Sequence, residues 1–230
     1  SHTHPIFVGN RSNEFSMRVD GKSYEEITEK GGGIISSIKG VRKASEDQLF
    51  EYGMDHLEIF LAHGTTTIEA KSGYGLDLES EIKSLRVIKK LNKESVLDVI
   101  PTFLGAHSFP PEYSDNHEGF VDLICDEMIP AVASENLAKY CDVFCEDGYF
   151  TVRQSRRILE TANEFGIAPR LHADEFKDSG AAELAAEVGA VSADHLMAAS
   201  NKGIKAMIQS GVIATILPGT TLFLGMNKYV

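Results

Sequence analysis

The sequence predicts an α/β fold, a (β/α)8 TIM-barrel that is incomplete, with about seven of its eight strands present. Strand-like segments alternate with helix-like segments along the chain, and a glycine often stands between a helix and the next strand. This alternation is typical of a parallel sheet covered by helices. Polar and titratable residues also gather at the C-terminal ends of the predicted strands, where barrels carry their functional sites.

The predicted strands are short apolar or β-branched segments with turn-forming residues around them. The first is the segment at His2. The others cover residues 65–71, 96–104, 141–146, 168–173, 190–195 and 212–217.

Three helices carry start and stop signals. Two begin at capping boxes, formed by Ser45 with Gln48 and by Thr151 with Gln154, and a third begins near Ser200. Glycine ends each of them, at Gly64, Gly166 and Gly211. An apolar strand follows each glycine within a few residues, which strengthens the prediction of a parallel sheet.

Composition narrows the functional classes. The chain has 230 residues, 43% of them hydrophobic, and no linker-like stretch divides it. Its formal net charge of −12 excludes nucleic acid and anionic membrane surfaces as expected partners, because both bind basic patches. No membrane span or signal peptide is evident, and the three cysteines lack metal-finger spacing. We therefore expect a cytoplasmic protein whose reduced thiols only pack.

An open doubly wound sheet has the same alternation as a barrel, so the polar residues must decide between them. No glycine-rich phosphate loop follows the early strands, which weakens the nucleotide-binding alternative. Six polar residues stand at or just beyond predicted strand ends: His4, Lys71, His107, Glu146, His172 and His195. This placement favours the barrel.

His2 and His4 stand two residues apart, so on a strand both side chains project to the same side and can share one metal ion. His172, from a distant strand, would nearly complete the coordination shell of that metal ion. Each residue alone has a structural explanation: a solvated chain end, a core histidine or, for Lys71, a salt-bridge partner. Their joint placement favours a metal-dependent hydrolase.

Five longer motifs carry a family resemblance. They are His2-Thr3-His4-Pro5, Glu69-Ala70-Lys71-Ser72-Gly73-Tyr74-Gly75, Thr102-Phe103-Leu104-Gly105-Ala106-His107, Leu171-His172-Ala173-Asp174-Glu175 and Ser192-Ala193-Asp194-His195-Leu196. In this order and over almost the whole chain they resemble the imidazolonepropionase family of the amidohydrolase superfamily.

The resemblance implies hydrolysis of the cyclic amide of 4-imidazolone-5-propanoate to N-formimidoyl-L-glutamate, a step of histidine degradation. It implies one Zn²⁺ or Fe ion per subunit, held by His2, His4 and His172. Zinc and iron both accept such ligands, so the sequence does not choose between them. The family's fourth ligand, an aspartate on strand eight, has no counterpart here.

The resemblance also assigns roles around the metal. Glu175 is expected to be the general base and then the acid, and His195 to stabilise the developing charge. The residues expected to contact the substrate are Arg11, Tyr74, His107 and Tyr24. Arg11 is suited to holding the propionate carboxylate, because a guanidinium group can donate two parallel hydrogen bonds to it.

Residues 1–230 are expected to form one metal-dependent hydrolase barrel domain that is partial, lacking both ends and the flanking small β-domain of complete family members. Weak metal binding and low activity follow as expectations. Two alternatives stay open: another amidohydrolase, such as a ring deaminase, or a non-catalytic barrel fragment. The expected partners are the small-molecule substrate and, from the family, a second subunit in a homodimer.

Overall fold

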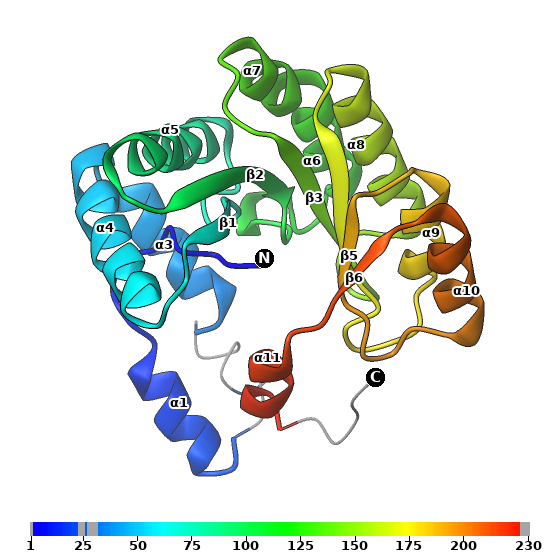
Figure 1. Ribbon diagram of the computed structural model, residues 1–230, viewed down its shortest axis with the longest axis horizontal. Helices are drawn as coiled ribbons and strands as arrows, with labels where there is room; N and C mark the ends of the chain where they lie inside the picture. The colour runs from blue at the N-terminus through cyan, green and yellow to red at the C-terminus, as the bar shows by residue number, and fades with distance from the viewer. Residues whose placement is uncertain (1, 23–25, 27–31, 226–230) are drawn as a thin grey trace.

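A computed structural model describes residues 2–22, 26 and 32–225 of the chain. Within these ranges, six parallel strands form one sheet in the order β1-β2-β3-β4-β5-β6. The strands are β1 (Thr67–Lys71), β2 (Asp98–Ala106), β3 (Tyr140–Cys145), β4 (Ala168–Ala173), β5 (Ser192–His195) and β6 (Ile213–Thr215). The sheet curls around a centre toward which the N-terminal segment runs (Figure 1). The parallel α/β class is thus confirmed, and the curled sheet fits an incomplete barrel.

The predicted count of seven strands is not confirmed, because the segment at His2 is not a strand. It still lies along β1: the Lys71 amide donates to the Thr3 carbonyl at 3.0 Å, and the Thr3 hydroxyl donates to the Glu69 carbonyl at 2.5 Å. Pro5 has no amide hydrogen to continue such a ladder. The segment therefore occupies a strand position without regular strand pairing.

Helices alternate with the strands, and most of them lie on the outer face of the curled sheet (Figure 1). They are α1 (Ser12–Val19), α3 (Ile34–Lys43), α4 (Glu46–Ala62), α5 (Leu78–Glu94), α6 (His117–Leu123), α7 (Ile129–Ser134), α8 (Val152–Glu164), α9 (Ala181–Glu187), α10 (Asn201–Ser210) and α11 (Pro218–Phe223), with a 3-10 turn at Pro111–Tyr113 and a π-helical turn at Ile124–Met128. Both predicted capping boxes are present, at the starts of α4 and α8. Ser200 caps α10, which ends at Gly211 in the left-handed conformation.

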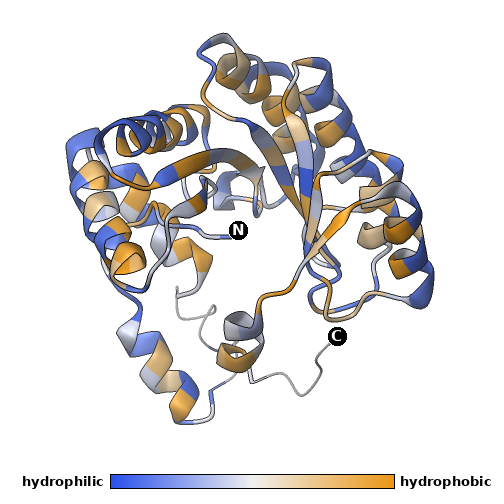
Figure 2. Cartoon of the chain, viewed as in Figure 1, coloured by the Kyte–Doolittle hydropathy of each residue, from blue (hydrophilic) through white to orange (hydrophobic). Residues whose placement is uncertain are grey.

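The apolar core lies between the sheet and these helices, whose outer faces are hydrophilic (Figure 2). Phe103, Leu85 and Leu159 are among its fully buried side chains. All three cysteines are buried and free, as their predicted packing role requires. None of the helices in the described ranges combines the length and apolar character that crossing a membrane demands.

Candidate metal centre

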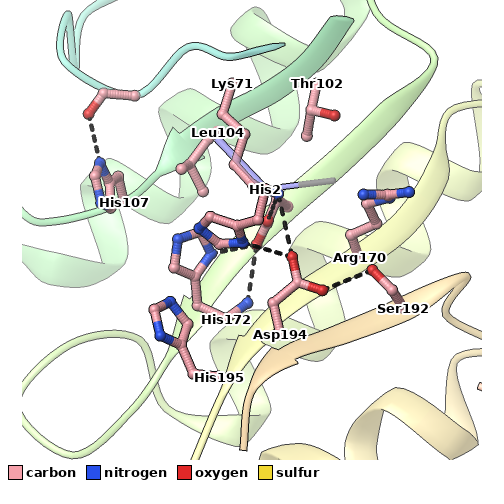
Figure 3. Close-up of polar contacts among 12 residues, drawn as sticks. His2, Lys71, Thr102, Leu104, His107, Arg170, His172, Ser192, Asp194 and His195 are labelled. Carbon is pink, nitrogen blue, oxygen red and sulfur yellow. Dashed lines mark hydrogen bonds and ion pairs between the residues drawn. The ribbon is translucent and has the colours of Figure 1, made fainter. Parts of the chain in front are cut away.

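Five histidines converge on the concave side of the sheet. His2 and His4 come from the N-terminal segment, His107 directly follows β2, His172 lies near the end of β4, and His195 ends β5. Their rings pack against one another, with centroids 4.4 Å apart for His2 and His172 and 4.9 Å apart for His4 and His107. Figure 3 shows His2, His172 and His195 grouped beside Asp194. The predicted meeting of the strand ends is present in the structure.

The Nε2 atoms of three histidines point at each other. His4 Nε2 lies 3.1 Å from His2 Nε2 and 3.3 Å from His172 Nε2. A tetrahedral zinc ion with Zn–N bonds of about 2.0–2.1 Å holds its nitrogen ligands roughly 3.3 Å apart. The spacing of these nitrogens therefore fits a metal ion of that size.

Two buried aspartates set the orientation of two of these rings. Asp142 Oδ1 accepts hydrogen bonds from the Nδ1 and backbone amide of His172, at 2.9 and 3.0 Å. Asp194 Oδ2 accepts from His2 Nδ1 at 2.6 Å. A carboxylate can only accept, so both histidines carry their proton on Nδ1 and present a bare Nε2 to the cluster. Such carboxylate partners are typical of metal-binding histidines.

The electrostatics of the cluster favour the neutral forms of His2 and His4. Burial, helped by the neighbouring His172, lowers the pKa of His2 well below its usual value, and burial with His107 does the same to the pKa of His4. Metal ligation needs the neutral imidazole. His4 Nδ1 is also buried, without a hydrogen-bond partner in the described protein. The donor set thus fits a transition-metal ion.

Other groupings are geometrically available to an ion. His2, His172 and His195 form one set with mutually close donor atoms, and His4, His107 and His172 form another. Both share His172, so these all-histidine arrangements centre on the end of β4, whereas a third set combines His2 with Glu69 and Asp194. His107 Nδ1 donates to the Gly73 carbonyl at 2.9 Å, which leaves its Nε2 free to face the cluster.

Glu175 and His195 lie at the edge of this cluster. Glu175 Oε1 is 3.5 Å from His195 Nδ1, and both side chains are buried. Burial raises the pKa of Glu175 to about 7, and burial together with His172 lowers the pKa of His195 to about 3. A carboxylate with a pKa near neutrality beside neutral imidazoles is suited to accepting a proton.

The backbone bends sharply where these residues are presented. Asp174, His195 and Leu196 have positive φ angles of 48°, 77° and 61°. Non-glycine residues adopt this conformation at a cost, and it is frequent at functional sites. The backbone amides of Ala181 and Ala182 donate hydrogen bonds to the Asp174 carboxylate, and these bonds offset part of the conformational cost at Asp174.

Tyr74 stands over the other side of the cluster, with its ring centroid 5.8 Å from His4 and 5.3 Å from His107. Its loop is held by Glu81, a fully buried residue whose carboxylate accepts the amide hydrogens of Gly73, Gly75 and Leu76. The structure therefore brings Tyr74 and His107, two of the predicted substrate contacts, to the histidines.

The remaining predicted residues are placed differently. The Arg11 guanidinium pairs with Glu14 at 2.6 Å and is partly exposed, outside the histidine cluster. Tyr24 lies outside the described residues. Glu146, predicted at a strand end, accepts the Phe176 amide at 2.9 Å and so secures the loop that carries Glu175.

Gly73→Ala is expected to destabilise the protein by about 2–4 kcal/mol. The φ of Gly73 is +102°, and an added Cβ would lie 2.8 Å from the Leu104 carbonyl oxygen and 3.1 Å from His107 Nδ1. Urea unfolding measures the loss. Gly148→Ala is the matched control, because Gly148 has a φ of +85° with nothing within 4 Å of the added atom. Equal losses in the two variants would contradict the predicted clash.

Solved structures with the same architecture identify the class. The 5-methylcytosine deaminase from Klebsiella pneumoniae matches with a TM-score of 0.62 over 93% of this chain and 52% of its own, at 14% sequence identity. The guanine deaminase from C. acetobutylicum matches with a TM-score of 0.57 over 79% of this chain and 46% of its own, also at 14% identity. The fold of this chain is thus the one that these two deaminases have over about half of their length, which fits an incomplete barrel.

Sequence comparison then identifies the family, although no family model matches the chain. An imidazolonepropionase of Shouchella clausii is 55% identical over 97% of this chain and 50% of its own length. An imidazolonepropionase of Thermoanaerobacter pseudethanolicus is 52% identical over 97% of this chain and 54% of its own length. Over this shared half, the chain is similar to members of the imidazolonepropionase family. It spans about half the length of the curated relatives it matches.

Proposed function

We propose that this chain carries the metal centre and base of an imidazolonepropionase, which hydrolyses 4-imidazolone-5-propanoate to N-formimidoyl-L-glutamate. The observation that carries the proposal is the convergence of the His2, His4 and His172 Nε2 atoms beside Glu175, a buried carboxylate with a raised pKa. The curated relatives bear the name imidazolonepropionase, and the motifs of this chain resemble those of that family.

His2, His4 and His172 would hold one zinc or iron ion. Such an ion supplies Lewis acidity, which makes water a usable nucleophile at neutral pH. Glu175 accepts the proton of the attacking water and returns it to the ring nitrogen that leaves. His195 donates a hydrogen bond to the oxygen on which negative charge develops. A neutral imidazole can do this because one of its nitrogens carries a proton.

Tyr74 and His107 would bind the imidazolone ring, because both border His4 on the open side of the cluster. The propionate carboxylate needs a cation in this acidic protein. Arg11 serves that role only if its guanidinium leaves Glu14, so substrate has to compete with an existing ion pair. Tyr24 completes the proposed set of substrate contacts.

Loss of imidazolonepropionate, measured with zinc or iron added, tests the proposal. N-formimidoyl-glutamate is the expected product. Release of ammonia from an aminated ring, with no turnover of imidazolonepropionate, would instead identify a ring deaminase. A chimera completed with the remaining half of the Shouchella clausii relative is assayed in parallel. If neither protein acts on imidazolonepropionate, the proposal is wrong.

The pH dependence of kcat/KM should report Glu175. Its carboxylate acts in the deprotonated form, so the rate is expected to fall about tenfold per pH unit below its pKa. Burial raises that pKa to about 7, and a bound cation would move it lower because positive charge favours the carboxylate. A profile that shows no fall in kcat/KM toward acid pH would exclude Glu175 as the base.

A further inference from the structure

Lys71 is fully buried beside the histidine cluster. Its Nζ lies 2.5 Å from Asp142 Oδ2, 2.8 Å from Glu69 Oε1 and 3.6 Å from Asp194 Oδ2. Burial opposes the charge on Lys71, but these three carboxylates raise its pKa, so the ammonium form prevails. A buried ammonium is stable only with such compensation. This lysine is therefore tied to the site by fixed ion pairs.

The ammonium is shared by the two aspartates that hold the histidines. Asp142 uses Oδ2 for Lys71 and Oδ1 for His172. Asp194 uses Oδ2 for both Lys71 and His2, while its Oδ1 accepts the Ser192 hydroxyl at 2.8 Å. One cation thus lies between two carboxylates, each of which contacts one histidine. Figure 3 shows Lys71 above His2 and Asp194.

We propose that Lys71 is a positioning residue, whose ammonium holds Asp142 and Asp194 so that His172 and His2 keep the tautomer with Nε2 facing the centre of the cluster. The tautomers belong to the metal-free chain, whereas the consequence for metal affinity rests on the proposed function. Lys71 touches neither the metal position nor the substrate in this arrangement. Its effect passes through the two aspartates.

A purely electrostatic role would have the opposite effect on metal binding. Lys71 is a positive charge close to the histidines and contributes to lowering the pKa values of His2 and His4. If it acted only as a repelling charge, its removal would tighten the binding of a cation. If it positions the aspartates, its removal would weaken binding. The sign of the change separates the two roles.

The test compares Lys71→Met with Thr102→Val. Thr102 donates to Glu69 Oε1 at 2.6 Å, so its loss disturbs the same buried network without touching either aspartate. Zinc alone is the probe, and its affinity is measured by competition with a chelator. We expect Lys71→Met to weaken zinc binding by about 10–100-fold and Thr102→Val to leave it unchanged. An affinity that rises or stays constant in Lys71→Met overturns the proposal.

Histidine ¹⁵N chemical shifts of the metal-free protein give the second readout. His2 and His172 should each show one tautomer in the parent chain and a mixture in Lys71→Met. If the parent binds no zinc, the proposed metal site fails, while this readout still decides the role of Lys71. Retention of both single tautomers in Lys71→Met overturns that role.

A double variant covers the case in which Lys71→Met does not fold. Lys71→Met/Asp142→Asn removes one of the carboxylates left without a counterion, and His2 becomes the reporter because its partner Asp194 is unchanged. Asp142→Asn alone is the control and should leave His2 in one tautomer. The double variant should mix the tautomers of His2. If His2 keeps one tautomer in both variants, Lys71 does not position Asp194.

Discussion

Glu175→Gln is expected to lower kcat for imidazolonepropionate by about 10²- to 10⁴-fold, the usual contribution of a general acid–base group. Glutamine keeps the size of the side chain but cannot take the proton of the attacking water. The buried position of Glu175, 3.5 Å from His195, leaves few alternative bases in the described part of the site. Steady-state rates of imidazolonepropionate loss, with the same metal present in both proteins, measure the change.

Glu146→Gln is the matched control, since this carboxylate lies nearby but accepts backbone amides of Phe176 and Asp147 instead of facing the histidines. Its kcat should change far less than that of Glu175→Gln. Zinc affinity should be retained in both variants because neither residue belongs to the proposed ligand set. A Glu175→Gln variant that keeps its full rate would point to another base or to a non-catalytic barrel.

Local sequence rules predicted the elements well because capping and strand composition act over a few residues. The capping boxes at Ser45 and Thr151 are both formed, and β4 has the predicted bounds of residues 168–173. The strand count failed at the N-terminal segment, where Pro5 interrupts pairing with β1. Closure of the sheet depends on contacts between distant segments, which local composition does not specify.

The histidines could be predicted because they follow strands, but the aspartates beneath them were missed. The alternation of side chains along a strand could have indicated these residues. An even number of positions separates each of them from a second polar residue on the same strand or at its end, so both side chains lie on one face of the sheet. The residues are Lys71, Asp142, His172 and Asp194. Asp142 stands within an apolar run, and Asp194 directly precedes the more conspicuous His195. Their pairing with His172 and His2 depends on strand order in space.

His195 shows what alternation alone cannot predict. It follows Asp194 directly, so in a regular strand its side chain would point away from the cluster. Its positive φ of 77° breaks the alternation, and its ring lies 5.0 Å from that of His2 and 5.2 Å from that of His172. The neighbouring structure must hold this conformation in place, because the residue alone does not favour it.

Zinc in large excess over its dissociation constant is expected to stabilise the folded chain, and this effect is independent of catalysis. At about 100 times the dissociation constant, a ligand that binds only the folded state adds about 2.7 kcal/mol. For a chain of this size that corresponds to an increase in Tm of about 5–10 °C. Thermal unfolding followed by circular dichroism, with and without zinc, measures the shift.

His172→Ala should abolish the zinc-dependent shift in Tm, because each of the three-histidine ligand sets in the cluster includes His172. His63→Ala is the matched control, since His63 is exposed on α4's C-terminal end and bonds only the Ile59 carbonyl in the described contacts. The comparison uses the shift and not Tm itself, because removing a buried ring also leaves a cavity. A zinc-dependent shift that survives in His172→Ala would place the ion elsewhere and remove the foundation of the proposed metal centre.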